Sequence, residues 1–322
     1  GIAGLVILLC AGSYTIILVL GGGPAATTLQ VAIQQALSMD FDPERAALLT
    51  FAQLTLTLFV LALLPSPPKQ ALAQGATEAR RWHRPQGWET VAAIPAIALA
   101  SLFVGLPLLA LVTAGLSADH VRIVGSSMFA QALVTSSVIA LASALLAVAA
   151  AVAIAAATYA MQSEGRSVRW IELLALAALG IPPLILGVGW FMLLAMLGQP
   201  FALAPLLIML ANAIMALPFA LQLIRPAIDR QFSQADRLAA ALRISGWQRI
   251  AMIDAPALQP ALVSSLFFAG ALSFGDLGVV TLYGSDHLTT LPALIYRSMG
   301  SYRTNDAAGL VLYLVVITGS LA

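Results

Sequence analysis

Long apolar runs recur along the whole of this chain, and they constrain its fold more than any other feature does. A helix of about 20 apolar residues crosses a hydrocarbon core about 30 Å thick. The alternation of apolar and polar residues that is typical of membrane barrels is absent, so we expect helices. The expected fold is an all-α polytopic membrane bundle with about eight transmembrane helices. Their expected ranges are 2–20, 46–65, 91–115, 129–160, 171–197, 202–224, 257–282 and 307–322.

The composition agrees with an integral membrane protein, because 61% of the residues are hydrophobic and only 9% are charged. Soluble domains contain roughly 45–50% apolar residues. The single cysteine, Cys10, lies within an apolar run and predicts no disulfide. The three histidines stand in separate polar loops, so we expect no metal site and no cofactor bound by this chain.

Basic residues are distributed unevenly between the loops. If the polar stretch 65–90 lies in the cytoplasm, alternation of the spans places eleven Lys and Arg residues inside and four outside. Cytoplasmic loops carry an excess of Lys and Arg, so this is the expected orientation. The inside residues are Lys69, Arg80, Arg81, Arg84, Arg166, Arg169, Arg225, Arg230, Arg237, Arg243 and Arg249. The outside residues are Arg45, Arg122, Arg297 and Arg303.

A segment near the start of the chain resembles one near its end. Residues 21–49 can be laid without a gap on residues 283–311, at an offset of 262. The matched residues are Gly22 with Gly284, Thr27-Thr28-Leu29 with Thr289-Thr290-Leu291, Ile33 with Ile295, Ala46 with Ala308, and Leu48 with Leu310. An apolar span precedes and follows each copy. The match predicts an internal repeat with both amphipathic loops on the outer side.

The stretch 65–90 is the longest polar segment, and its proline, glycine and charge content predicts a cytoplasmic linker. We therefore expect residues 1–64 to be the end of one membrane unit and residues 91–322 to be most of a second. Because the chain begins and stops within apolar runs, we expect it to be a fragment of a longer protein.

Several predicted spans contain residues that interrupt or polarise a helix. Gly187 and Gly189 follow a Pro-Pro pair in one span, where they favour either close helix packing or a hinge. Asn212 precedes Pro218 in another span. Polar residues in such spans usually face the interior of the bundle, so Asn212 favours the interpretation as a helix that lines a pathway.

Asp276 is the one acidic residue well inside a predicted span, 257–282. A charge at that depth costs about 2.5–3.5 kcal/mol on insertion scales, and such residues are usually functional. We predict that Asp276, Asn212, Gly275 and Phe274 line a translocation pathway, where the ring of Phe274 can face a cation. The alternatives are that Asp276 accepts hydrogen bonds from a neighbouring helix or lies in a water-filled mouth, and that the aromatic ring serves packing.

A polar segment at 225–256 separates two apolar runs and contains five arginines and three aspartates. The apolar spacing predicts two short helices joined by a turn at Ser245-Gly246, the second starting at Trp247 and continuing to Pro256. Such a pair at the inner face of a membrane suits the groove of a soluble partner. The alternative is an interfacial helix that Trp247 and the arginines anchor at the lipid headgroups.

This segment resembles the EAA loop of the inner-membrane subunits of ABC importers. That loop reads Glu-Ala-Ala, then Gly four residues later, and Ile-x-Leu-Pro at its end. The matching positions here read Arg237-Leu238-Ala239, Arg243 and Ile253-Asp254-Ala255-Pro256, so the acidic residue, the first alanine, the glycine and the leucine are replaced. The resemblance implies a segment that couples the membrane helices to an ATPase. The coupling residues it implies are Arg237, Leu238, Ala239, Ala240, Arg243, Ser245, Gly246, Trp247, Ile253 and Pro256.

A second resemblance extends over essentially the whole chain. Residues 21–37, 212–220 and 272–309 are similar to the thiamine ABC transporter permeases, which fuse two type I permease halves in one polypeptide. The resemblance implies a multi-pass permease of the bacterial inner membrane. It also implies that a periplasmic binding protein delivers thiamine or its phosphates, and that the fixed positive charge of thiamine passes Asp276.

The same resemblance implies that ATP is hydrolysed elsewhere. No G-x-x-x-x-G-K-[ST] phosphate loop occurs in the sequence, so we expect a transport subunit and not an enzyme. Two cytoplasmic ATPase subunits would use ATP and Mg²⁺, and no nucleic-acid partner is expected. Permeases for ferric iron or polyamines share the fused layout and stay as alternatives, as does a secondary transporter with parallel repeats.

Overall fold

The computed structural model of the chain describes residues 17–18, 27–63, 88–168, 170–171, 178, 183–198, 201, 203–242, 246–283 and 288–321. Every regular element in these ranges is a helix, which confirms the all-α prediction. The helices are α3 (Leu29–Ser38), α4 (Pro43–Leu63), α5 (Trp88–Leu116), α6 (His120–Val124), α7 (Ser127–Ser163), α9 (Pro183–Met196), α10 (Ala204–Leu242), α11 (Gly246–Arg249), the π-helix η1 (Ile250–Asp254), α12 (Ala255–Phe274), α13 (Gly278–Tyr283), α14 (Leu291–Gly300) and α15 (Thr304–Leu321).

Five helices of the described part are long and apolar enough to cross a membrane, and this marks the chain as a membrane protein. They are Ala93–Leu116, Ser127–Ser163, Ala204–Ser233, Met252–Phe274 and Thr304–Leu321. The predicted span 46–65 corresponds to α4, and the second half of the predicted span 171–197 to the shorter apolar helix α9. The predicted span 2–20 lies outside the described residues apart from 17–18.

The core of the bundle forms where α7, α10 and α12 pack against one another. Small side chains fill the place where they meet: Ala144 and Ala147 of α7, Ala213 and Ala216 of α10, and Ala269 of α12. Small residues allow helix backbones to approach closely, which is how membrane helices gain packing contacts that lipid does not offer. The alanine-rich sequence of α7 therefore suits a central helix.

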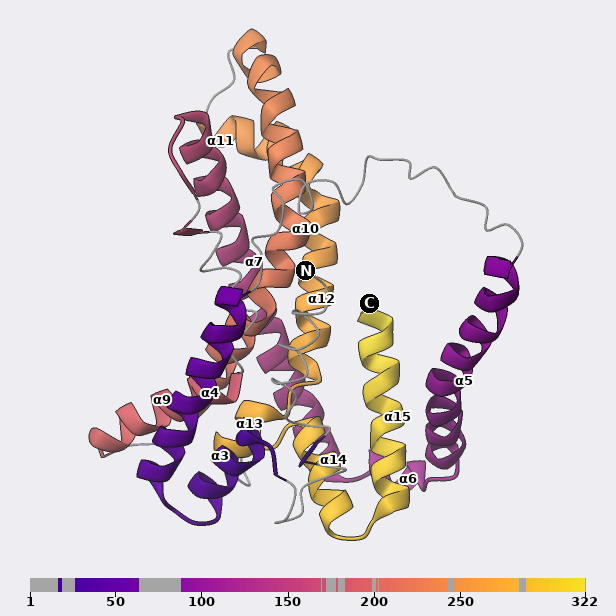
Figure 1. Ribbon diagram of the computed structural model, residues 1–322. Helices are drawn as coiled ribbons and strands as arrows, with labels where there is room; N and C mark the ends of the chain where they lie inside the picture. The colour runs from indigo at the N-terminus through magenta and orange to yellow at the C-terminus, as the bar shows by residue number, and fades with distance from the viewer. Residues whose placement is uncertain are drawn as a thin grey trace.

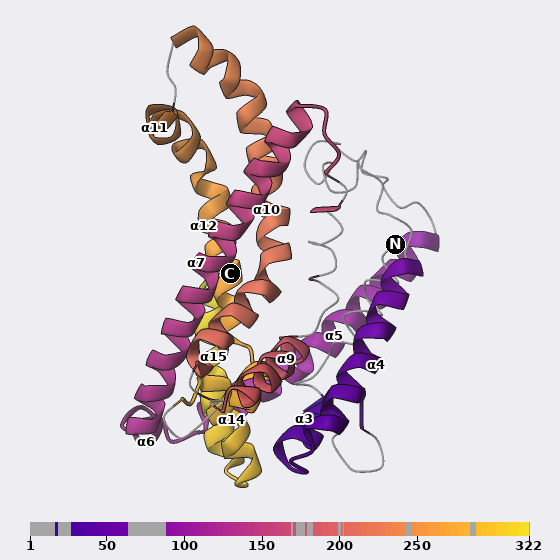
Figure 2. The same ribbon diagram turned by 90° about the vertical axis from the view of Figure 1, so that its left-hand side faces the viewer.

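The helices α7 and α10 have 37 and 39 residues, whereas about 20 suffice to cross a membrane. Figures 1 and 2 show the end of α7, the end of α10 and the start of α12 extending beyond the other helices at the end of the molecule where α11 lies. The elements α3, α6 and α14 lie at the opposite end. The predicted cytoplasmic segment and the predicted outer loops thus fall at opposite ends of the bundle.

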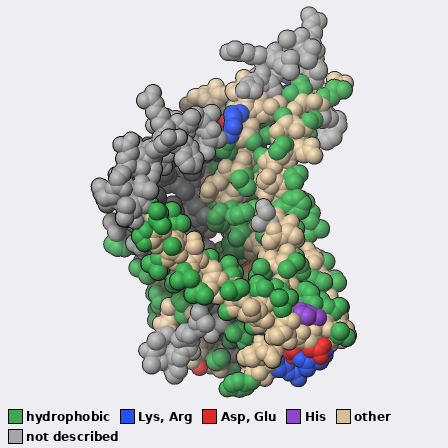
Figure 3. All heavy atoms as spheres, turned by 90° about the vertical axis from the view of Figure 1, so that its right-hand side faces the viewer, with side chains coloured by type: hydrophobic (Ala, Val, Ile, Leu, Met, Phe, Trp, Pro, Cys, Tyr) green, Lys and Arg blue, Asp and Glu red, His purple; other side chains and the backbone are tan. Residues whose placement is uncertain are grey.

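Large hydrophobic side chains are exposed on several helices, including α4, α5, α7 and α12. Figure 3 shows such side chains over much of one face, with charged side chains gathered at the end that carries α6. At that end Arg122 forms ion pairs with Asp119 and with Asp306 of α15. The helices α5 and α15 approach closely there: a Cβ added at Gly115 of α5 would lie 2.9 Å from the Cβ of Leu312 in α15. The arrangement agrees with a lipid-facing belt between two polar ends.

The two copies of the repeat form the same substructure. Helices α3 and α14 begin 262 residues apart, after Thr28 and Thr290, whose backbones are both extended. Each helix ends in a turn that contains one non-glycine residue with positive φ, Phe41 at 51° and Tyr302 at 58°. Both helix–turn–helix units lie at the same end of the molecule (Figure 1), as expected for a parallel repeat.

The gapless alignment of the two copies is wrong beyond the first helix. Phe41 and Tyr302 are 261 residues apart, and so are the starts of α4 and α15, Pro43 and Thr304. The turn of the second copy is therefore one residue shorter. Burial follows the shorter offset: Ala46 and Ala307 are both buried. The earlier match of Leu48 with Leu310 fails, because Leu48 is 71% exposed and Leu310 is 4% exposed.

Candidate translocation and coupling sites

The predicted span 257–282 is not one helix. Helix α12 ends at Phe274, Gly275 caps it, and Asp276 lies in the short link before α13. The Oδ1 atom of Asp276 accepts a hydrogen bond of 3.2 Å from the backbone N–H of Gly278, the first residue of α13. The expectation that Asp276 stands well inside a continuous span is therefore wrong. Glycine is favoured at helix ends, and an Asp side chain can accept a hydrogen bond from the backbone two residues later. Gly275 and Asp276 can therefore separate two helices although the residues on either side are apolar.

Asn212 and Asp276 meet at the end of α12. The side-chain Nδ2 of Asn212 on α10 donates to the hydroxyl of Ser273 at 2.9 Å and to its carbonyl at 3.4 Å. The backbone N–H of Asp276 donates to the same carbonyl at 3.3 Å. The structure thus brings together two of the predicted pathway residues, which are 64 positions apart in the sequence.

This junction presents acceptor oxygens that have no donor. The Oδ1 of Asn212 and the Oδ2 of Asp276 are both buried, and neither has a hydrogen-bond partner among the described residues. A buried acceptor without a partner is unfavourable by about 1–3 kcal/mol, and a carboxylate by more. The arrangement can accept hydrogen bonds from a ligand or attract a cation. We name this group of Asn212, Ser273 and Asp276 the polar junction.

Phe274 follows Ser273 of the polar junction in the sequence, but its side chain is buried in the packed interior. It is buried in a cluster with Phe129 of α7 and with Leu291 and Leu294 of α14. Gly275 is exposed and forms the cap of α12, with its N–H bonded to the carbonyl of Ala271. The contacts of Phe274 are those of a packing residue, the alternative that the sequence left open, and its place in a pathway stays a prediction.

A second cluster joins α3 to α9 and α13. Ile33 of α3, Val188 of α9, and Val279, Val280 and Tyr283 of α13 are all buried in it. The cluster therefore connects helices on the two sides of the predicted linker. Because α13 starts at the polar junction, these contacts also hold Asp276 in place. The sequence does not predict this cluster, although the run Gly278–Tyr283 is apolar.

The two glycines of α9 differ in their surroundings. A Cβ at Gly187 would lie 3.2 Å from Leu282 and 3.3 Å from Val279, so this glycine allows α13 to approach closely. A Cβ at Gly189 would meet nothing within 4 Å. Close packing is thus observed at Gly187, one of the two interpretations that its sequence allowed.

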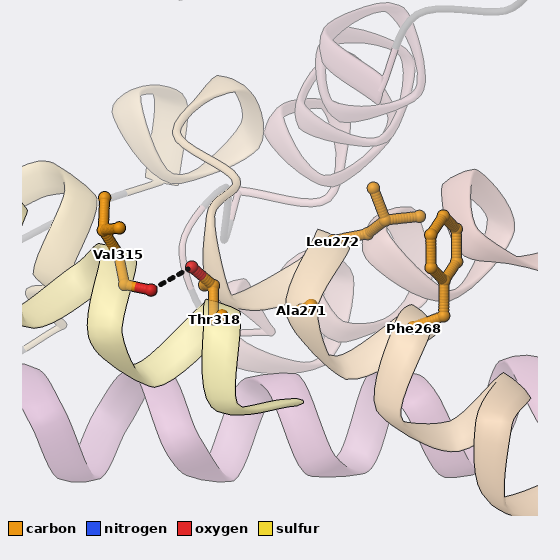
Figure 4. A pocket seen from close by; sticks show the side chains of 6 residues that line it. Phe268, Ala271, Leu272, Val315 and Thr318 are labelled. Atoms are coloured by element: carbon orange, nitrogen blue, oxygen red, sulfur yellow. Dashed lines mark hydrogen bonds between the residues drawn. The ribbon is translucent and has the colours of Figure 1, made fainter. Parts of the chain in front are cut away.

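A groove between α12 and α15 offers no comparable chemistry. It is lined by Phe268, Ala271, Leu272, Val315, Thr318 and Gly319 (Figure 4). The hydroxyl of Thr318 donates to the carbonyls of Leu314 and Val315 in its own helix, the second of which is the dashed line in Figure 4. An apolar groove whose one hydroxyl is already bonded is suited to lipid or to another apolar surface.

The predicted coupling segment has a different shape from the expected pair of short helices. Helix α10 continues without interruption from Ala204 to Leu242, so its first part extends a membrane helix. After residues 243–245, which are outside the described part, α11 and the π-helix η1 lead directly into α12. The sequence predicts that a helix ends at Pro256. In the structure Pro256 lies instead in the first turn of α12, where proline is tolerated. The segment is therefore a hairpin at the tips of α10 and α12.

The structure describes only some of the predicted coupling residues. Gly246 starts α11 with a φ of +59°, a conformation that L-residues other than Asn and Asp rarely adopt, so the predicted break at this glycine is confirmed. Ile253 is half-buried, and its carbonyl accepts a hydrogen bond of 3.3 Å from Gln231 of α10. Arg243 and Ser245, and the side chains of Arg237, Leu238, Ala239, Ala240 and Trp247, lie outside the described part. Their role in coupling stays a prediction.

Metal binding has no support in the part of the chain that the structure describes, where no group of His, Cys, Asp and Glu residues could hold an ion. No family model matches the chain.

The chain is similar to the Thiamine transport system permease protein ThiP of Brucella abortus (strain 2308), with 45% identity over 320 residues. Those residues are 98% of this chain and 59% of that protein. The chain is homologous to the thiamine transport permeases. The permease of the same name from Escherichia coli (strain K12) is 34% identical over 321 residues, and the one from Haemophilus influenzae is 31% identical over 330 residues. The family resemblance predicted from the sequence is confirmed.

These permeases are longer than the chain, which spans about 60% of the length of the curated relatives that it matches. Their names describe transport proteins and not enzymes. These names, together with the long apolar helices of the described part, indicate that the chain is a membrane protein.

Proposed function

We propose that this chain forms part of the membrane permease of an ATP-driven importer that carries thiamine or thiamine phosphates into the cytoplasm. The observation that supports the proposal most is the similarity to thiamine transport permeases over 98% of the chain. In this proposal a periplasmic binding protein delivers the substrate and two cytoplasmic ATPase subunits supply the energy. The chain lies in the inner membrane of a bacterium and binds neither ATP nor Mg²⁺ itself.

The arrangement of α10 and α12 supports a mechanism for the coupling. Asn212 of α10 and Ser273 of α12 contribute to the polar junction, and the other ends of the same two helices carry the coupling segment. From Asn212 to Leu242 the helix α10 spans about 45 Å, at 1.5 Å per residue. A movement imposed on the hairpin by an ATPase reaches the polar junction through two continuous helices. Two discrete arrangements of these helices would open the junction to either side.

The polar junction suits a cationic substrate. Thiamine has a fixed positive charge, and the junction contains a carboxylate oxygen and an amide oxygen without donors. Attraction between opposite charges is strong where water is excluded. The same chemistry would suit other cations, so the substrate assignment depends on the relatives and not on the junction alone.

Uptake in living cells tests the proposal. The complete permease is expressed in a bacterial strain that lacks its own thiamine permease, and uptake of labelled thiamine is compared with that of ferric iron and putrescine. We expect thiamine uptake that depends on a functional ATPase subunit. Uptake of iron or putrescine alone would contradict the substrate. Uptake that persists without any ATPase subunit and collapses with the ion gradient would indicate a secondary transporter.

A further inference from the structure

The coupling hairpin contains an ion pair that the sequence did not reveal. The guanidinium Nε of Arg249 donates to the Oδ2 of Asp254 at 3.1 Å. The Asp254 side chain is only 7% exposed and that of Arg249 24% exposed, so the pair is largely shielded from solvent. The other carboxylate oxygen, Oδ1, is buried without a hydrogen-bond partner among the described residues. The pair lies at the point where the hairpin enters α12.

The spacing of this pair depends on the π-helix. Arg249 and Asp254 are five residues apart, and η1 covers Ile250–Asp254. In an α-helix with 3.6 residues per turn, residues five apart are rotated by about 140° and face different directions. The hydrogen bonds of a π-helix join residues i and i+5, so that residues at this spacing come close together. The five-residue spacing of the ion pair therefore fits the π-helix better than a regular α-helix in its place.

The pair is braced by the neighbouring helices. The guanidinium of Arg249 lies 5.4 Å from the ring centroid of Phe232 on α10, within the range of a cation–π contact. Phe232 in turn contacts Tyr159 of α7 edge-on, with their ring centroids 5.1 Å apart. Gln231, next to Phe232, bonds to the carbonyl of Ile253 inside the π-helix. The π-helix is thus tied to both α10 and α7 at the base of the hairpin.

We propose that Arg249 and Asp254 are positioning residues, which fix the π-helix so that motion of the coupling hairpin is transmitted to α12. This inference rests on the proposed function, since it assumes that an ATPase drives the hairpin. Breaking a shielded pair leaves an uncompensated charge and frees the turn to rearrange. A regular α-helix at 250–254 would rotate the hairpin relative to α12, so force applied to the hairpin would no longer act in the right direction. The residues of the hairpin that an ATPase would contact would be unchanged, so binding of the ATPase would be retained.

Variants of the complete permease, purified with the ATPase subunit and reconstituted in liposomes with the binding protein, test this role. The variants are Arg249→Ala, Asp254→Asn, Arg249→Lys and the double substitution of Arg249 and Asp254 by alanine. Arg166→Ala is the matched control, because Arg166 pairs with Glu164 at 3.4 Å but both side chains are more than 60% exposed. The measurements are recovery of the ATPase with the permease, ATP hydrolysis, and thiamine taken up per ATP hydrolysed.

We expect Arg249→Ala and Asp254→Asn to retain the ATPase and to hydrolyse ATP, while uptake per ATP falls by about fivefold or more, a typical size for coupling between sites. The double variant is expected to be no worse than Arg249→Ala, because both changes remove one interaction. Arg249→Lys keeps the charge and is expected to recover most of the uptake. The Arg166→Ala control is expected to match the unsubstituted protein. If Arg249→Ala does not accumulate in the membrane, the nearly isosteric Asp254→Asn provides the test.

Normal uptake per ATP in Arg249→Ala and Asp254→Asn would overturn the positioning role, and so would an Arg249→Lys variant as impaired as Arg249→Ala. Loss of the bound ATPase in these variants would also overturn it, because the pair would then belong to the docking surface. A failure of the proposed function looks different. In that case the unsubstituted permease itself would bring down no ATPase or would transport no thiamine.

Discussion

The hydroxyl of Tyr283 donates a hydrogen bond of 2.7 Å to the main-chain carbonyl of Gly187, deep in the cluster that joins α9, α13 and α3. The tyrosine is 1% exposed, and burial of its ring anchors the end of α13. Since α13 begins just after Asp276, this bond helps to define where the carboxylate stands. The bond connects α13 to α9, and the same cluster contains Ile33 of α3, which precedes the predicted linker.

Tyr283→Phe should remove that hydrogen bond without changing the packing of the ring. We expect the free energy of unfolding to fall by about 1 kcal/mol, the usual net contribution of one hydrogen bond. Thermal unfolding of the purified permease in detergent measures the change. Tyr302→Phe is the control, because Tyr302 is 93% exposed and should show no shift. Equal stability of the Tyr283→Phe protein would mean that the bond contributes nothing net.

Gly187→Ala and Gly189→Ala should have opposite effects on stability although they are two residues apart in the same helix. At Gly187 the added methyl group would press on Leu282 and Val279, and overpacking costs about 1–3 kcal/mol. At Gly189 it meets open space, and Ala favours a helix over Gly by about 1 kcal/mol. The two unfolding temperatures are compared with that of the unsubstituted protein. A stabilising Gly187→Ala would mean that the side chains of Leu282 and Val279 shift to make room for the methyl group.

Asp276→Asn should impair transport while the permease still assembles. The amide keeps the shape of the side chain and its bond to Gly278 but removes the negative charge. We expect thiamine uptake to fall by about tenfold, which corresponds to about 1.4 kcal/mol of lost attraction. Asp40→Asn serves as the control, because Asp40 pairs with Arg45 in an exposed turn. An unchanged uptake rate would assign Asp276 to the capping of α13 alone.

Gly246 should tolerate asparagine better than valine. Its φ of +59° costs a residue with a Cβ about 1–2 kcal/mol, whereas Asn adopts this conformation more readily. We expect Gly246→Val to lower both uptake and ATPase recovery, and Gly246→Asn to retain most of each. A Cβ added there would meet no atom within 4 Å, so the first side-chain atom of either residue meets no neighbour. Equal performance of the two variants would exclude backbone conformation as the cause.

The fold class could be predicted from the sequence because apolar runs of membrane length leave few alternatives to helices. The position of Asp276 could not be predicted from hydropathy, since the apolar residues on both sides of Gly275 hide the end of α12. The repeat was recognised from Thr28 and Thr290, yet one residue missing from a turn does not show in an alignment with so few identities. The Arg249–Asp254 pair could not be predicted from the sequence, because residues five apart face different directions in a regular α-helix and nothing in the sequence indicates the π-helix.

The shorter turn of the second repeat gives a rule for transferring experimental results between the two copies. A substitution before the turn, such as at Ile33, should be compared with the residue 262 positions later, Ile295. A substitution after the turn, such as at Ala46, should be compared with Ala307, at 261 positions. A mutational scan aligned with one constant offset would pair exposed residues of α4, such as Leu48, with buried residues of α15, such as Leu310. It would then report an asymmetry between the copies that comes from the alignment alone.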